Sequence, residues 1–265
     1  MPESYWNKNA EPETTEKQEI FSQLRTPPET PFFVRLNGRR FQAVSEKLRA
    51  EKPFDKSFAK CLVKSGRALF QANLNPSLVY VASDEINALF LHAIPFGGRV
   101  EKINSVLAGT TSSAFSVYTI KHFKKPLTVA FDSRIIIVTR RKVNDYLSYR
   151  QRDAWRNHNN AYAYWLMRKQ GRKPSEAAKI LKGLKTKELH ELLFNQGVNL
   201  AKTPAWQRRG ILLYRQPHQK LKENLIFTRW RIEENWNLPL FTSTDGSALL
   251  KRILEWTKPH KISEE

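Results

Sequence analysis

Hydrophobic and polar positions along residues 31–140 follow the periods of short strands and two helices. The expected strands are Phe32–Leu36, Leu78–Ala82 and Ile86–Ala93, with further strand material at Leu127–Phe131 and Arg134–Thr139. The expected helices are Asp55–Gln71, which has Asp55 as its N-cap and Phe58, Cys61, Leu62, Leu69 and Phe70 at helical spacing, and Arg99–Tyr118, which has Ile103, Val106, Leu107, Ala114 and Val117 on one face. The order strand, helix, strand, strand, helix, strand predicts an α+β fold of the ferredoxin-like (βαββαβ) type.

The flanking segments differ from this central part. Residues 1–30 have little apolar periodicity and are expected to form a polar tail with one short helical piece, "EKQEIFSQLR". A further helical turn is expected at "SEKLRAE". After residue 140 the pattern becomes helical, with one or two helices at Val143–Gln170, short helices in "KPSEAAKILKG" and "TKELHELLFNQG", a strand pair in "GILLYRQ" and "NLIFTRWRIE", and a last helix in "SALLKRILEW". We therefore expect three parts: a tail (1–30), a sheet-and-helix domain (31–140) and a helical extension with C-terminal strands and a helix (141–265).

Composition narrows the class of protein. The sequence of 265 residues is 40% apolar, which suits a globular fold, and it has no run of about 18 apolar residues that would predict a membrane span. The single cysteine, Cys61, excludes an intramolecular disulfide and a Cys-rich zinc site, and core packing on a helix is its expected role. A reducing cytoplasm is the expected location.

Charge is the strongest compositional signal. Lys and Arg total 45 against 25 Asp and Glu, a formal net charge of +20. The first 17 residues hold four Glu and two Lys, so the remainder carries +22. A basic excess of this size predicts a polyanionic partner, most often a nucleic acid, although a generally basic surface is the simpler alternative. Seven Trp and eight Tyr lie mostly among the basic stretches, which favours bases and phosphates over a membrane surface.

Two breaks in the strand pattern carry the candidate chemistry. Asn37-Gly38 ends the first expected strand, and Ser83-Asp84-Glu85 connects the next two, so the expected topology places the breaks side by side. Acids on adjacent strands suit a site that holds two Mg²⁺ ions over a triphosphate. Asp84 is the best ligand candidate, Glu85 either assists or faces away, and Gly38 allows close backbone approach and offers its carbonyl. The alternative is that these residues are ordinary turn formers.

Basic side chains near these breaks could bind phosphates. They are Arg35, Arg39, Lys52, Arg99 and Lys102, of which the last two lie three apart on one helix face. For Arg99 and Lys102 the alternative is that they are ordinary surface charges.

Eight segments in this order resemble one known family. They are "FFVRLNGRRF", "EKPFD", "VASDE", "RVEKI", "FDSRIII", "DYLSYRQRDAWRN", "LKGLKTKELHELLF" and "AWQRRG". Together they are similar to the tRNA-histidine guanylyltransferases and their bacterial and archaeal relatives, the 3′-to-5′ polymerases of the 5′-end repair type. The resemblance implies a polymerase-like palm at 31–140, a tRNA- and nucleotide-handling extension at 141–265, two Mg²⁺ ions, ATP or GTP and the 5′ end and acceptor stem of tRNA as substrates, and a homotetramer.

The same resemblance implies a reaction. The 5′-monophosphate of tRNA is first nucleotidylated, and the 3′-hydroxyl of an incoming nucleotide then attacks it, so that the tRNA grows at its 5′ end. Repair-type relatives do this against a template strand, whereas the true guanylyltransferases add one G to tRNA-histidine.

Residue roles follow from the resemblance position by position. The catalytic set is Asn37, Asp84 and Glu85, and the metal-binding set is Asn37, Gly38 and Asp84. Nucleotides and phosphates would be bound by Arg35, Gly38, Arg39, Arg40, Phe41, Gln42, Lys52, Asp55, Ser83, Arg99 and Lys102. The tRNA would be bound by Arg134, Arg150, Gln151, Asp153 and Asn157.

Four positions depart from the guanylyltransferase pattern. Gln42 and Trp155 stand where a histidine is usual, and Leu189 stands where a lysine is usual, which favours the repair-type branch over strict tRNA-histidine guanylylation. Asn37 stands where the family has its first metal-binding aspartate, so we expect impaired turnover. The substitution is either an engineered or a natural change. The competing hypotheses are a tRNA-binding module with a decayed catalytic site and a nucleotide cyclase that shares the palm.

Overall fold

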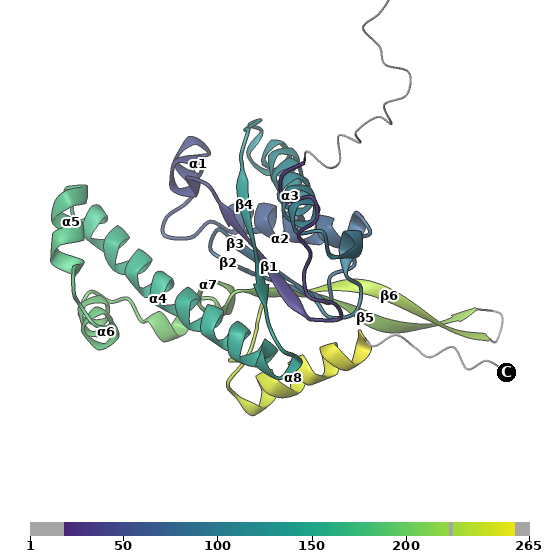
Figure 1. The fold of residues 1–265 in the computed structure, drawn as a ribbon. Coiled ribbons are helices and arrows are strands. Elements are labelled where there is room, and N and C mark those ends of the chain that lie inside the picture. Colours follow the sequence, from purple (N-terminus) through teal and green to yellow (C-terminus); the bar gives the residue numbers. More distant parts are fainter. Residues whose placement is uncertain (1–18, 223–224, 258–265) are drawn as a thin grey trace, which may run out of the picture.

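One antiparallel sheet organises the molecule in the computed structural model, which describes residues 19–222 and 225–257 (Figure 1). Its strand order is β4-β1-β3-β2-β5-β6. The strands are β1 (Phe32–Gly38), β2 (Leu78–Ala82), β3 (Glu85–Phe90), β4 (Phe131–Ile137), β5 (Ile211–Lys222) and β6 (Leu225–Asn235). The first four strands have the ferredoxin-like order 4-1-3-2, so the predicted α+β class is confirmed, and the predicted strand pair β5–β6 extends this sheet beside β2.

The helices lie on both faces of the sheet and beyond it (Figure 1). They are α1 (Phe41–Lys47), α2 (Lys56–Gln71), α3 (Val100–Phe123), α4 (Val143–Lys169), α5 (Pro174–Leu181), α6 (Thr186–Asn195), α7 (Ala205–Arg209) and α8 (Thr244–Trp256), with short 3-10 turns at Pro95–Gly98, Arg140–Lys142 and Leu200–Lys202. None of the helices in the described residues is long and apolar enough to cross a membrane.

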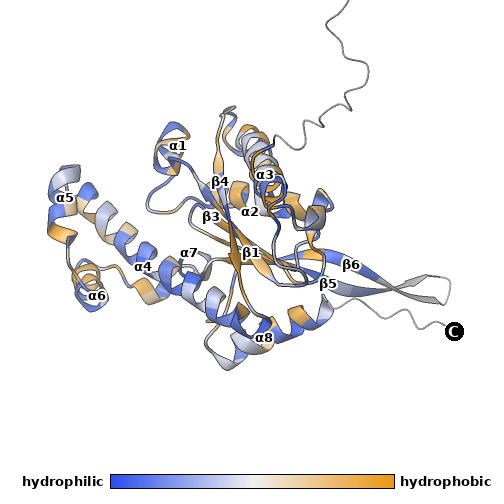
Figure 2. Cartoon of the chain, in the orientation of Figure 1, coloured by the Kyte–Doolittle hydropathy of each residue, from blue (hydrophilic) through white to orange (hydrophobic). Residues whose placement is uncertain are grey.

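The sheet has a hydrophobic core on each of its two faces, and the side chains of β1 point alternately into one and the other. Phe32, Val34 and Leu36 join the buried cluster beneath α2 and α3, whereas Phe33 joins the cluster formed with α4 and α8. Figure 2 shows orange along the central strand β1 and a mixture of blue and orange along α4. The side chain of Asn37 follows the parity of Phe33 and therefore lies on the α4 face of the sheet.

Helix α4 carries the extension away from the sheet (Figure 1). Its outer half packs against α5 and α6 around a third, smaller cluster that includes Ala163, Leu189, Leu193 and Leu200. The predicted helices at 143–170, in "KPSEAAKILKG" and in "TKELHELLFNQG" are confirmed, the first of them as one continuous helix.

Helix α3 differs from its prediction in length and in phase. It runs five residues further, to Phe123, and its buried stripe is Ile103, Leu107, Thr111, Phe115 and Thr119. Val117, which we predicted to face the core, is 62% exposed. The buried positions recur every four residues. They include the predicted Ile103 and Leu107, and a search for apolar residues alone misses the two buried threonines.

Three strand and turn predictions were also wrong at their edges. Strand β4 begins only at Phe131, which pairs with Gly38, the last residue of β1; residues 127–130 therefore have no partner along β1. Strand β3 ends at Phe90 instead of Ala93, and α1 begins at Phe41, four residues before the predicted helical turn.

The helical piece predicted for "EKQEIFSQLR" is also wrong where it can be tested. Its first three residues lie outside the described part of the chain, and residues 19–23 form turns. Ile20 and Phe21 are largely exposed, so this segment lacks the packed apolar face that stabilises a short helix.

Candidate functional site

The two breaks in the strand pattern lie together in one row of paired residues that runs across strands β3, β1 and β4. Asn37 of β1 lies opposite Glu85 of β3 on one side and opposite Asp132 of β4 on the other. The backbone N–H of Gly38 donates to the carbonyl of Asp84 at 2.9 Å. The predicted proximity of Asn37-Gly38 to Ser83-Asp84-Glu85 is therefore confirmed.

Gly38 is required by packing as well as by position. A Cβ atom at this residue would lie 2.3 Å from Cδ2 of Phe41, whose buried ring packs against Phe58, Phe115 and Phe131. The absence of a side chain lets the start of α1 fold back against the end of β1. Phe41 acts through this packing and also lines the cavity described below.

Asp84 occupies the turn between β2 and β3. Ser83 before it has a left-handed backbone (φ 55°), which reverses the chain. Burial raises the pKa of the Asp84 carboxyl, and the nearby charges of Glu85 and Asp132 raise it further, against hydrogen bonds from its own backbone and Ser83. A cation at this position would relieve the cost of holding the carboxylate there.

Asn37 contacts a further carboxylate, that of Asp132, which was not among the predicted site residues. Its Nδ2 donates to Oδ1 of Asp132 at 3.5 Å. Asp132 also pairs with Nε of Arg134 at 3.4 Å, and both side chains are about half exposed (50% and 59%). Asp132 lies in "FDSRIII", but only the register of β4 against β1 places it beside Asn37.

Glu85 is committed to an ion pair. Nε and Nη2 of Arg150 donate to its two carboxylate oxygens at 2.8 and 2.7 Å, and Nε of Arg35 lies 3.9 Å away. Asn87 donates to the same carboxylate at 2.8 Å. With its side chain 12% exposed, Glu85 holds α4 against the sheet through this ion pair, and whether it assists at a metal site stays a prediction.

The residues assigned to tRNA on α4 divide into two groups. Arg150 is held by Glu85 and also by Asp153, whose Oδ2 it reaches at 2.8 Å, and Gln151 is buried with its amide bonded to the backbone of Arg209, Pro239 and Phe241. These three side chains are held by contacts inside the protein, and their assignment to tRNA stays a prediction. Asn157 lines the cavity, and Arg134 stands exposed on β4.

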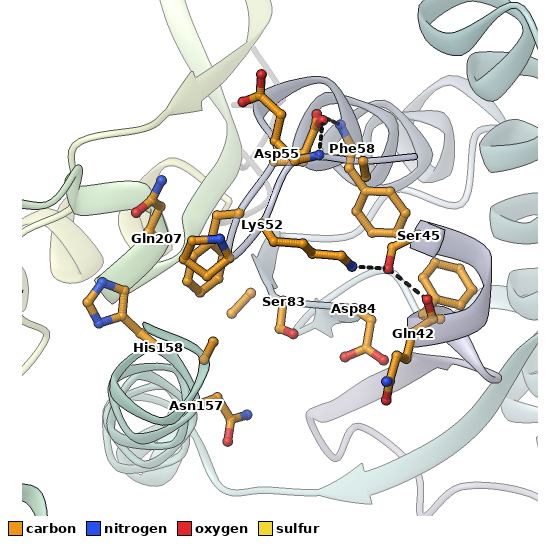
Figure 3. A pocket seen from close by; sticks show the side chains of 18 of the residues that line it. Gln42, Ser45, Lys52, Asp55, Phe58, Ser83, Asp84, Asn157, His158 and Gln207 are labelled. Atoms are coloured by element: carbon orange, nitrogen blue, oxygen red, sulfur yellow. Dashed lines mark hydrogen bonds between the residues drawn. The ribbon is translucent and has the colours of Figure 1, made fainter. Parts of the chain in front are cut away.

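A cavity of about 590 Å³ adjoins Asp84 (Figure 3). Its volume is in the range of sites for small ligands. Aromatic walls come from Phe54, Phe58, Tyr164, Trp165 and Trp206, and polar groups come from Gln42, Ser45, Lys52, Asp55, Ser83, Asp84 and Asn157. An apolar cavity with a carboxylate and a lysine at its edge can accept a flat base and its attached phosphates.

Lys52 and Asp55 form one polar wall of the cavity. Nζ of Lys52 donates to Oγ of Ser45 at 2.5 Å and lies 5.4 Å from the centroid of the Trp165 ring, and burial lowers its pKa. Asp55 accepts from the backbone N–H of Phe58 at 2.9 Å and so caps α2, as predicted. Figure 3 shows the Lys52 side chain extending toward Ser45, within the same space as Asp84.

The remaining basic candidates lie on β1, directly after it and at the start of α3. Arg39 and Arg40 are exposed directly after β1. Arg35 lies two residues before Asn37 on the same face, with its Nε buried and without a hydrogen bond. Arg99 precedes α3, and Lys102 lies over the ring of Phe96 at 5.5 Å.

His158 is a further residue that the sequence did not reveal. It is buried between the rings of Trp155 and Phe54 and bonds Asn159 and Oγ1 of Thr203. Burial lowers its pKa from 6.5 to about 4, and it lines the far wall of the cavity. A lone histidine within a helix gives no sequence signal for such a position.

Comparisons with known proteins agree with this arrangement. A family model described as tRNAHis guanylyltransferase matches residues 13–139, and a model described as the C-terminal domain of the same family matches residues 141–262. The tRNA(His) guanylyltransferase of Schizosaccharomyces pombe is 31% identical over 196 residues, which cover 72% of this chain and 75% of the relative.

Solved structures share the fold. A bacterial tRNA(His) guanylyltransferase-like protein in complex with ATP is 24% identical, with a TM-score of 0.71, and the match covers 90% of this chain and 96% of that chain. A bacterial guanylyltransferase-like protein in complex with GTP is 22% identical, with a TM-score of 0.67 and coverage of 91% and 96%. With the two family models and the S. pombe relative, these likenesses confirm the resemblance in the sequence motifs: the chain belongs to the tRNA-histidine guanylyltransferase family of nucleotidyltransferases.

Proposed function

We propose that this protein adds nucleotides to the 5′ end of tRNA in the 3′-to-5′ direction, against a template strand. The observation that carries the proposal is the meeting of Gly38 and Asp84 beside a cavity large enough for a nucleotide. Membership of a nucleotidyltransferase family supports the same reaction class. The relatives named above as complexes with ATP and GTP support both nucleotides as ligands.

The cavity and the basic residues at its rim would bind different parts of the nucleotide. The aromatic walls would take the base of the activating nucleotide, and Lys52, together with the exposed Arg39 and Arg40, would neutralise its phosphates. Arg99 and Lys102 at the start of α3 add positive charge. Nucleotidylation of the tRNA 5′-monophosphate would release pyrophosphate, and the 3′-hydroxyl of the incoming nucleotide would then displace the activating group.

The donor atoms at this position suit Mg²⁺. The carboxylate of Asp84, the carbonyl of Gly38 and the amide oxygen of Asn37 are hard oxygen ligands of the kind that Mg²⁺ prefers. Two bound Mg²⁺ ions would supply charge neutralisation for the attacking and leaving oxygens. Asn37 brings no charge, so we propose that turnover is impaired relative to an aspartate at this position.

The test is a paired assay of the protein and its Asn37→Asp variant. Both would be given a 5′-truncated tRNA, Mg²⁺ and labelled nucleotide. We expect Asn37→Asp to raise incorporation by roughly 10²–10³-fold, the usual effect of one electrostatic contributor to a transition state. Asn37 is prone to deamidation because a glycine follows it. Mass spectrometry at residue 37 therefore controls for trace aspartate in the unchanged protein.

The amide at residue 37 also favours one alternative, a tRNA-binding module whose catalytic site has decayed. That alternative predicts tight tRNA binding and no incorporation by either protein. Such a result would overturn the proposed reaction.

We also propose that the protein is a homotetramer in the cytoplasm. Large apolar side chains that lie exposed in the described residues, including Val117, Ile120 and Phe194, support burial of part of the surface in an assembly. Light scattering should give a mass about four times the 30.9 kDa of one chain, and a monomeric mass would contradict the tetramer.

The single, buried cysteine supports the proposed reducing location in the cytoplasm.

A further inference from the structure

The row that contains Asn37 holds carboxylates on both sides of it. Asp132 and Glu85 are the residues directly opposite Asn37 on β4 and β3, and all three side chains share the parity that faces α4. Directly opposite residues of an antiparallel pair have Cβ atoms about 4.5–5.5 Å apart. Either carboxylate could therefore bring its charge to the place where the family's aspartate would lie.

The ion pairs decide between the two. Glu85 is 12% exposed and its two oxygens are taken up by Arg150, so withdrawing it would leave a buried arginine without its partner. Asp132 is half exposed, and its pair with Arg134 at 3.4 Å joins two exposed side chains. Exposed pairs of this kind contribute about 0–1 kcal/mol, so Asp132 can change partner at little cost.

The direction of the Asp132 side chain agrees with this choice. Its Oδ1 lies 3.5 Å from Nδ2 of Asn37, so the carboxylate points along the row toward the centre of the site. The next residue of β1, Gly38, bonds the backbone of Asp84. Asp132, Asn37 and the Asp84 turn thus follow one another across three adjacent strands.

We propose that Asp132 supplies the carboxylate that Asn37 lacks, so that in this chain a divalent cation is held by Asp84 and Asp132 together. This inference rests on the proposed function. Asp132 brings a second carboxylate to the cation from β4 instead of from residue 37, which supports binding of the cation while turnover stays below that of an aspartate at residue 37. One or two carboxylates with phosphate and water are the usual ligand set of Mg²⁺. When Asp132 turns to the cation, Arg134 loses its partner and becomes available to a phosphate.

The test measures metal binding without turnover. Mn²⁺ would be titrated, with electron paramagnetic resonance as the readout, into the protein, Asp132→Asn, Asn37→Asp and the double variant. In the native background we expect Asp132→Asn to weaken Mn²⁺ binding by at least about tenfold, because loss of even an outer partner of a metal ligand typically costs about 10–100-fold. In the Asn37→Asp background the same change should cost far less, because residue 37 then carries the charge.

The matched control is Asp145→Asn. Asp145 is also an exposed aspartate paired with a cation, since Lys142 lies 3.0 Å away, and its loss should leave Mn²⁺ binding unchanged. Circular dichroism and thermal melting confirm that each variant is folded. Equal effects of Asp132→Asn in both backgrounds, or no effect in the native one, would overturn the proposal.

The same variants separate this inference from the proposed function. If no variant incorporates nucleotide but Mn²⁺ binding depends on Asp132 as described, the reaction is wrong and the metal ligand is right. If incorporation proceeds and Asp132→Asn changes neither its rate nor Mn²⁺ binding, the reaction stands and Asp132 is not the ligand.

Discussion

Gly38 has a packing role that can be tested apart from catalysis. We expect Gly38→Ala to lower the free energy of unfolding by about 1–3 kcal/mol, the usual cost of forcing extra volume into a packed core. The new Cβ would meet the Phe41 ring at 2.3 Å, and that ring is enclosed by Phe58, Phe115 and Phe131. Urea unfolding monitored by circular dichroism measures the change.

Gly109 provides the control for that substitution. It lies within α3, and a Cβ there would meet no heavy atom within 4 Å. Gly109→Ala should stabilise the protein by up to about 1 kcal/mol, because alanine favours a helix over glycine. The two substitutions therefore have opposite signs, and a stable Gly38→Ala variant would show that the Phe41 ring can move aside.

His158 makes stability depend on pH. Its pKa in the folded protein is about 4, below the ordinary value of 6.5, so the fold favours the neutral ring. As pH falls below about 6.5, the unfolded chain takes up the proton first, and stability is lost progressively down to about pH 4. The full loss is roughly 3 kcal/mol, from about 1.4 kcal/mol per unit of pKa difference.

His158→Gln isolates this contribution from other groups that titrate in the same range. Unfolding would be measured between pH 7.5 and 4 for both proteins, and the slopes with pH would be compared, not the absolute stabilities. We expect the variant to have a flatter profile above pH 4.5. Parallel profiles would mean that His158 does not remain neutral in the folded protein.

The individual residues also show how far sequence can lead to a site. Asp84 and Asn37 were predicted to be neighbours because strand order alone brings the two chain breaks together. Asp132 depends on the register of β4, and a shift of one residue would have turned it to the other face. Glu85 and Arg150 are 65 residues apart, and their pairing becomes visible only when α4 is placed on the sheet.

At the level of whole elements, the Glu85–Arg150 pair links β3 to α4. Arg150→Ala would leave the Glu85 carboxylate largely buried without its main partner, and we expect a loss of about 3 kcal/mol in the free energy of unfolding. Arg156→Ala removes a cation of the same helix that is 66% exposed and pairs with Asp153 at 3.0 Å, and it should cost less than about 1 kcal/mol.

A double-mutant cycle shows whether the cost belongs to this contact. Glu85→Gln and Arg150→Ala, singly and together, would be compared by urea unfolding. The effects of the two changes should be strongly non-additive, because either substitution alone already breaks the Glu85–Arg150 ion pair. Additive effects would show that Arg150 stabilises α4 through contacts other than Glu85.

Elements were easier to predict than their edges and faces. Helix α2 was predicted correctly in its apolar face and its Asp55 cap because both signals are local. The face of α3 was predicted correctly at Ile103 and Leu107, but Thr111 and Thr119 were missed because polar residues are buried where apolar ones were expected. The start of β4 was wrong because a strand extends only as far as its partner β1 allows, which local sequence does not encode.

For the whole molecule, the net charge of +20 is the sequence property that most directly predicts a polyanionic partner. The structure shows that individual basic residues do not contribute equally. Arg150 is neutralised inside the molecule, whereas Arg134 stands exposed at the rim of the site. Charge counts therefore predict the class of ligand, and the ion pairs indicate which cations are available to it.

This distinction predicts how tRNA binding responds to salt. Log affinity should fall linearly with log salt concentration, and each lost phosphate contact should lower the steepness of that line by about one. Arg134→Ala should reduce the steepness in this way. Arg150→Ala should leave it unchanged at a temperature where the variant is folded, because the arginine is already paired with Glu85 and Asp153. Filter binding to a 5′-truncated tRNA between 50 and 200 mM salt, a range over which about 10³-fold in affinity can be lost, measures both. An equal reduction by the two substitutions would mean that the Arg150 pair opens when tRNA binds.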